Sequence, residues 1–90
     1  MKKTKGKHSS SFRSGDFAFV VKCDLASYRN SLGMTQSQLA DYVGVSVNTI
    51  SAIETGHSLP SVPLAYALSI ALDIRMDSLF YLHSIGSAAR

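Results

Sequence analysis

The side chains that could carry covalent or metal chemistry are few in this chain of 90 residues, and they stand far apart. The ligand-forming types are one cysteine and three histidines: Cys23, His8, His57 and His83. A zinc site needs several such residues at short spacing, and the sequence lacks that pattern. None of the serines lies in a nucleophile-elbow context. We therefore expect no enzyme, no metal site and no cofactor, with Cys23 a small buried residue.

Many side chains that can form hydrogen bonds lie instead in residues 34–56. Within this segment the sequence predicts two short helices. Thr35 can cap the first helix, and Gln38, three residues later, completes a capping box. The helix is expected over about residues 36–43. Its apolar positions form one stripe that should face the core: Leu39, Ala40 and Val43.

A second short helix should follow after a tight turn. Gly44 tolerates the positive φ that the turn requires, and Val45 supplies an apolar plug behind it. Ser46 can then cap a helix over about residues 47–55, with Ile50 and Ile53 directed inward. The small Ala40 would let the two helices approach closely. Such a pair leaves a polar face on its second helix, as a helix-turn-helix does when it enters the major groove of DNA.

The flanking sequence supplies the elements that must hold this pair. We expect one helix before it, from about residue 24 to 31, and a longer helix capped by Ser61 with Pro63 in its first turn. A fifth short helix is expected from Asp77 to about Leu82. The run from residue 17 to 21 fits either helical spacing or a short strand of aromatic and β-branched residues.

Charge is unevenly distributed around the formal net value of +3. Most of the cations precede residue 31, so we interpret residues 1–16 as a flexible basic tail, residues 17–85 as one domain and residues 86–90 as a frayed end. No apolar run approaches the roughly 20 residues that span a bilayer. With one cysteine and no secretory signal, the expectation is a cytoplasmic protein without a membrane partner.

An ordered set of motifs resembles the lambda-repressor/Cro-like (Xre-like) helix-turn-helix proteins, over about Leu25 to Leu82 without a gap. The matching residues are Leu25-x-x-Tyr28-Arg29, Met34-Thr35-Gln36, Leu39-Ala40, Gly44-Val45-Ser46, Thr49-Ile50-Ser51-x-Ile53-Glu54-x-Gly56, Pro60-Ser61 and Asp77-x-Leu79-Phe80. The resemblance implies an all-α fold, a compact five-helix DNA-binding domain behind the flexible N-terminal tail. Its partner would be double-stranded DNA.

The resemblance also implies roles for single residues. The positions that would face base edges are Val47, Asn48, Ser51 and Ala52, and the block of DNA-binding residues is completed by Gln36, Ser46 and Thr49. Thr49 would contact the DNA backbone, and Gln36 would reach a phosphate or brace Asn48. The amide of Asn48 can bond adenine N6 and N7 together. The alternatives are a solvated helix residue for Asn48 and minor helix packing for Val47.

Two sets of charged residues receive different interpretations. The family pattern implies that Arg29 and Glu54 form a structural ion pair, in preference to Arg29 acting as a phosphate clamp. Because no Lys or Arg lies between Thr35 and Pro60, we expect phosphate contacts from elsewhere. These contacts would come from Lys2, Lys3, Lys5, Lys7, Arg13 and His57, with a merely solubilising tail as the alternative.

The apolar segment Leu79 to Leu82 is denser than a short helix needs. Part of it should close the core, and the rest could form a two-fold interface, alone or with residues 17–21 as paired strands. We therefore interpret the chain as a transcriptional regulator, a repressor that binds a palindromic operator as a homodimer. The alternative is an antitoxin or other protein-interaction module of the same fold, with a toxin or effector protein as its partner.

Overall fold

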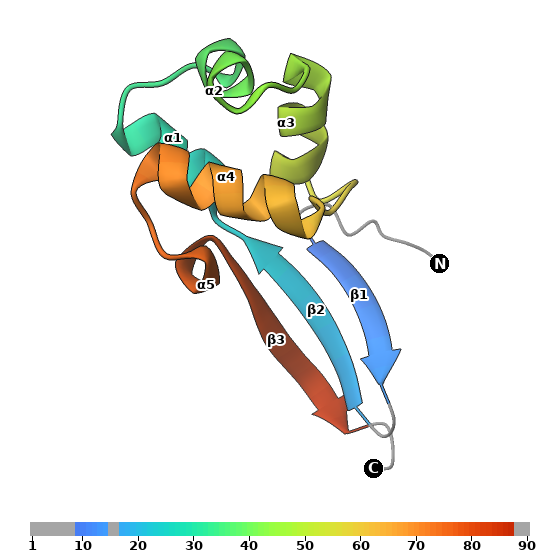
Figure 1. The fold of residues 1–90 in the computed structure, drawn as a ribbon. Helices are drawn as coiled ribbons and strands as arrows, with labels where there is room; N and C mark the ends of the chain where they lie inside the picture. Colours follow the sequence, from blue (N-terminus) through green and yellow to red (C-terminus); the bar gives the residue numbers. More distant parts are fainter. Residues whose placement is uncertain (1–8, 15–16, 88–90) are drawn as a thin grey trace.

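The computed structural model describes residues 9–14 and 17–87, and its helices cluster at one end of a narrow sheet (Figure 1). The sheet consists of β1 (Ser9–Ser14), β2 (Phe17–Cys23) and β3 (Phe80–Ser87). Five helices lie between β2 and β3: α1 (Leu25–Ser31), α2 (Gln36–Val43), α3 (Val47–Glu54), α4 (Val62–Leu72) and α5 (Met76–Leu79). Helices α2 and α3 lie over the ranges expected for the pair.

The five expected helices are present, but the fold is not all-α, because the chain also forms a sheet. The three strands form one antiparallel sheet in the order β1-β2-β3, with β2 in the centre. Of the two readings left open for residues 17–21, the strand is correct. A strand prevails because β1 and β3 flank β2 and satisfy its backbone donors and acceptors, which one isolated helical turn at that place would leave to water.

The ends of the chain also differ from expectation. Residues 9–14 were assigned to the flexible tail, but they pair with β2 from Ser9 opposite Lys22 to Ser14 opposite Phe17. Backbone pairing needs no apolar periodicity, so this strand gave no signal. The remaining tail residues, 1–8 and 15–16, lie outside the described residues.

At the C-terminal side, α5 ends at Leu79, where a helix reaching about Leu82 was expected. Phe80 is already extended, at φ −131° and ψ 127°, and begins β3. Gly86 and Ser87 belong to this strand, with Ser87 opposite Phe17, so the fraying expected from residue 86 is wrong for both. The apolar density at 79–82 arises because the segment changes from core helix to sheet strand within two residues.

The core lies between the helices and contains side chains from all five. Its fully or almost fully buried members are Leu25, Leu39, Ala40, Ile50, Ile53, Leu68, Leu72 and Leu79. The predicted capping box is formed, since Thr35 Oγ1 accepts from the Gln38 N–H at 3.0 Å and Gln38 Oε1 accepts from the Thr35 N–H at 2.8 Å. Ser46 and Ser61 cap α3 and α4.

The junction between β2 and α1 attaches the sheet to this core. The Asp24 N–H donates to the Leu79 carbonyl at 2.9 Å, and the Tyr81 hydroxyl donates to Asp24 Oδ2 at 3.2 Å. Asp24 stands at the N-cap of α1 but makes no side-chain cap bond there. Cys23, expected to be buried, is half-buried against the core, and burial raises the pKa of its thiol.

Helix α4 offers a matched test of where the core lies. Leu68 is 0% exposed and Ile70, two residues on, is 76% exposed. We predict that Leu68→Ala lowers the free energy of unfolding by about 2–5 kcal/mol, because it leaves a cavity. Ile70→Ala should change it by less than about 0.5 kcal/mol. Urea unfolding of the two variants measures both values, and equal losses would contradict this description of the core.

Candidate nucleic-acid interface

Helix α3 presents a small face that the other described residues leave open. Ile50 and Ile53 fix its inner side in the core. On its outer side, Val47 is 40% exposed and Asn48 is also exposed, whereas Ser51 and Ala52 are half-buried. Within the described part of the chain, no hydrogen bond occupies the Asn48 amide, so this side chain retains its donors and its acceptor for a ligand.

The first turn of α3 is held by its own hydroxyl groups. Ser46 Oγ accepts from the Thr49 N–H at 3.1 Å, and the Ser46 and Thr49 hydroxyls lie 2.9 Å apart. These bonds fix the start of α3, the turn that carries Asn48. Both hydroxyls therefore act first as structural groups, and Ser46 remains exposed.

The turn before α3 sets the angle between α2 and α3. Gly44 adopts φ +79°, a left-handed conformation that costs a residue with a Cβ about 1 kcal/mol. Its N–H and that of Val45 both donate to the Ala40 carbonyl, at 2.9 and 3.0 Å. Val45 then packs against the core, and Ala40, 2% exposed, lies where the two helices approach.

Arg29 joins three parts of the domain through one guanidinium group. Its Nε donates to Glu54 Oε2 at 2.6 Å and its Nη2 donates to Glu54 Oε1 at 3.1 Å, a bidentate pair between α1 and α3. Its Nη1 donates to the Met34 carbonyl at 2.7 Å and to Asn30 Oδ1 at 3.1 Å. The hydrogen bonds to Glu54 raise the pKa of the Arg29 guanidinium above its usual value.

This pair is structural, since both residues are only 9% exposed and every donor-bearing nitrogen of Arg29 has a partner. Four of the five guanidinium N–H groups of Arg29 are thus engaged within the domain, which leaves little of the side chain for a phosphate. The hydrogen bond from Arg29 to the Met34 carbonyl could not be predicted, because every residue has a backbone carbonyl and its position depends on the fold.

Gln36 occupies a place that the sequence did not suggest. It was expected to reach a phosphate or brace Asn48, but its Nε2 donates to Glu54 Oε1 at 2.9 Å. The first residue of α2 is thereby tied to the last residue of α3. In this structure Gln36 extends the Arg29–Glu54 pair into a network that fixes both helices of the motif.

Most of the cations expected to contact phosphate lie outside the described residues. Lys2, Lys3, Lys5 and Lys7 are outside the described residues, and Arg13 lies in β1. His57 follows α3 and is exposed. Its ring Nδ1 lies 2.8 Å from Thr55 Oγ1, and its backbone N–H donates to the Ala52 carbonyl at 2.9 Å. The described α2–α3 surface therefore carries no Lys or Arg.

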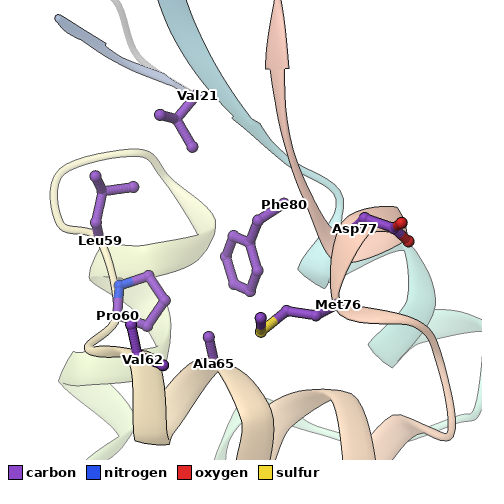
Figure 2. A pocket seen from close by; sticks show the side chains of 8 residues that line it. All are labelled: Val21, Leu59, Pro60, Val62, Ala65, Met76, Asp77 and Phe80. Carbon is purple, nitrogen blue, oxygen red and sulfur yellow. The ribbon is translucent and has the colours of Figure 1, made fainter.

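A separate apolar hollow of about 310 Å³ lies between the sheet, the α3–α4 loop and α4 (Figure 2). The Phe80 ring stands in its middle, while Leu59 and Pro60 line the loop side. Asp77 lines it too, but its carboxylate points away, and Arg75 Nη2 is bound to Asp77 Oδ2 at 2.8 Å. No polar group of the lining is directed inward to orient a ligand.

The described residues contain no group of histidine, cysteine and acidic residues that could hold a metal ion. No helix among them is long and apolar enough to cross a membrane.

Comparison with known proteins identifies the same segment. The family model described as Helix-turn-helix matches residues 25–79, from the start of α1 to the end of α5. The phage CTXphi transcriptional repressor RstR of Vibrio cholerae is 34% identical over 59 residues, 66% of this chain and 53% of the repressor. The chain thus spans about half the length of that relative.

Two further relatives are matched over most of their length. An uncharacterised helix-turn-helix-type transcriptional regulator of Archaeoglobus fulgidus is 39% identical over 60 residues, 67% of this chain and 86% of that protein. The uncharacterised helix-turn-helix-type regulator YgzD of Bacillus subtilis is 34% identical over 62 residues, 69% of this chain and 94% of that protein.

The buried pair gives a test against an exposed one. Glu54→Gln should lower the free energy of unfolding by about 3–5 kcal/mol, because it leaves the Arg29 charge buried without its counterion. The control is Asp77→Asn, which breaks the exposed Arg75–Asp77 pair and should leave the free energy of unfolding almost unchanged. Urea unfolding measures both. A small loss for Glu54→Gln would show that the pair does not hold α1 to α3.

Proposed function

The chain belongs to the helix-turn-helix family, and from this premise we propose that it is a DNA-binding transcriptional regulator whose α3 enters the major groove. The observation that carries the proposal is the exposed face of α3, where the free amide of Asn48 stands on a helix fixed at both ends. The Arg29–Glu54–Gln36 network would keep this face in position without reorganisation when DNA binds.

The residues of α3 would divide the work of recognition. Asn48 would bond the N6 and N7 atoms of an adenine, a bidentate contact that distinguishes this base. Val47 and Ala52 can offer only methyl groups, which suit the methyl group of a thymine. Ser51 would supply a further hydroxyl, and Ser46 and Thr49 would contact the DNA backbone at the helix start.

The edge of the sheet formed by β3 supports a homodimer. Strand β3 has no partner on that edge within the described residues, and its eight residues contain no Lys, Arg, Asp, Glu or Pro. Natural sheets protect exposed edges with such residues, so an unprotected edge favours pairing with another strand. Two copies joined there would present two α3 helices to a palindromic operator, and occupancy of that operator would make the protein a repressor.

The alternative, an antitoxin or other protein-interaction module, is favoured by one observation. The α2–α3 surface has no Lys or Arg between Thr35 and Pro60, which weakens electrostatic attraction to phosphates. The two functions separate experimentally, because a module that binds only protein would not discriminate between DNA sequences. For the regulator, the tail lysines would supply the missing attraction.

Asn48→Ala tests direct readout. Affinity for the best DNA site should fall roughly 5- to 150-fold, since a bidentate base contact is worth about 1–3 kcal/mol, while affinity for unrelated DNA stays the same. Fluorescence anisotropy with labelled duplexes measures both. Ser27→Ala, an exposed serine-to-alanine change on α1, is the control and should leave both affinities unchanged. Equal affinities of the parent and Asn48→Ala for the best site would contradict readout by Asn48.

The basic tail has a separate electrostatic test. Replacing Lys2, Lys3, Lys5 and Lys7 with serine should reduce the slope of log affinity against log salt by up to about 0.9 for each lysine that reaches a phosphate. Replacing the same four lysines with arginine keeps the charge and should keep the slope. An unchanged slope in the serine variant would mean that the tail makes no phosphate contacts. The variants leave β1, which begins at Ser9, intact.

A further inference from the structure

Helix α4 is apolar on its solvent side as well as on its core side. Its inner residues, Ala65, Leu68 and Leu72, are buried. The outer residues Val62, Tyr66 and Ile70 are 66%, 55% and 76% exposed. A helix that is apolar all round is normally enclosed by protein on every side, whereas an ordinary surface helix turns charged residues to water. Among the residues that the structure describes, none covers this outer apolar side of α4.

The outer residues form a continuous line, which we call the α4 stripe: Val62, Tyr66 and Ile70. Their spacing of four residues aligns them on one face, over about 12 Å of helix. The one serine within this face of the helix, Ser69, does not interrupt its apolar character, because its hydroxyl donates to the Tyr66 carbonyl at 2.7 Å. The donor of the Ser69 hydroxyl is thus satisfied within α4.

The stripe continues onto α2 at one end and towards the sheet at the other. Tyr42 of α2 is 66% exposed and lines, with Ile70, Ala67 and Ala71, a hollow of about 270 Å³ where α2 packs on α4. At the other end, Val62 also lies at the apolar hollow shown in Figure 2. A ridge beside a groove between two helices is the shape into which a third helix packs.

The charges next to the stripe that have no ion-pair partner within the described residues are acidic. Asp41 precedes Tyr42, and Asp73 follows α4 directly; both are exposed, and neither has an ion-pair partner within the described part of the chain. The nearby Arg75 and Asp77 neutralise each other. No Lys or Arg occurs between Ser31 and Ile74, so α2 and α4 bring no cation to offset the two aspartates.

We propose that the α4 stripe, with Tyr42, binds an amphipathic helix of a partner protein that carries an apolar face flanked by basic residues. Charge complementarity identifies this occupant. A second copy of this chain placed here about a two-fold axis would bring Asp41 and Asp73 against the same acidic surface. The stripe lies on α4 and α2, so the partner would leave the outer face of α3 open.

The proposal has a direct binding test with synthetic peptides. The probe is a helical peptide of about five turns, with leucines on one face and lysines on both flanks. Matched peptides carry glutamate in place of lysine, or the same residues in an order that destroys the apolar face. Fluorescence anisotropy of labelled peptides should show binding of the first peptide only, and salt should weaken it.

Variants of the protein locate the contact. Tyr66→Gln together with Ile70→Gln should weaken binding of the lysine peptide about tenfold or more, because two central apolar contacts are lost. Leu32→Gln, which changes a side chain 56% exposed at the C-cap of α1, is the control and should bind as the parent does. Asp41→Asn with Asp73→Asn should reduce the salt dependence and the preference for lysine over glutamate flanks.

Three outcomes would overturn the proposal. The first is equal binding of the lysine peptide to the parent and to the Tyr66→Gln, Ile70→Gln variant. The second is equal binding of the peptide without an apolar face. The third is sedimentation of the parent as a dimer and of that variant as a monomer, which would show that a second copy covers the stripe. DNA binding by the variant is measured in parallel and should be unchanged, so the two proposals fail independently.

Discussion

The buried contact between Arg29 and Glu54 is the interaction on which the arrangement of the motif depends. Removing two charges from water is costly, and the cost is offset here only because the guanidinium bonds the carboxylate twice, at 2.6 and 3.1 Å, and also bonds the Met34 carbonyl. Such a geometry is satisfied in one arrangement of α1, α3 and the loop before α2. Gln36 adds the start of α2 to the same carboxylate. The pair therefore specifies how the helices meet, while the apolar core supplies most of the stability.

The second constraint is the attachment of the sheet. Strand β2 runs into α1 through Asp24, whose N–H bonds the Leu79 carbonyl and whose carboxylate accepts from Tyr81. The elements before and after the five helices are thus joined at one place, although they lie far apart in sequence. The sheet extends away from the helices (Figure 1), so its outer edge and the α3 face are separate surfaces of one chain. That separation would let the α3 face bind DNA, as we propose, while the edge of β3 pairs with a second copy.

Residues whose local chemistry decides their structure were predictable from the sequence. Thr35 and Gln38 form the expected capping box, and Gly44 adopts the expected positive φ. The sheet was not predictable in the same way, because Ser9–Ser14 has no apolar pattern and acquires its structure only by pairing with β2. Gln36 illustrates the same limit within the site. Its identity fits a phosphate contact, and only the position of Glu54 on the neighbouring helix shows which group it bonds in this structure.

We propose that the outer face of α3 reads a DNA sequence as part of a symmetric pair. Selecting bound duplexes from a random pool with the full chain tests this proposal, because one measurement reports binding, base preference and symmetry. We expect enrichment of a palindrome whose half-sites lie about one helical turn apart, roughly 10 base pairs, with a fixed adenine in each half-site. A pool that remains random after selection, or an enriched sequence without two-fold symmetry, would contradict it.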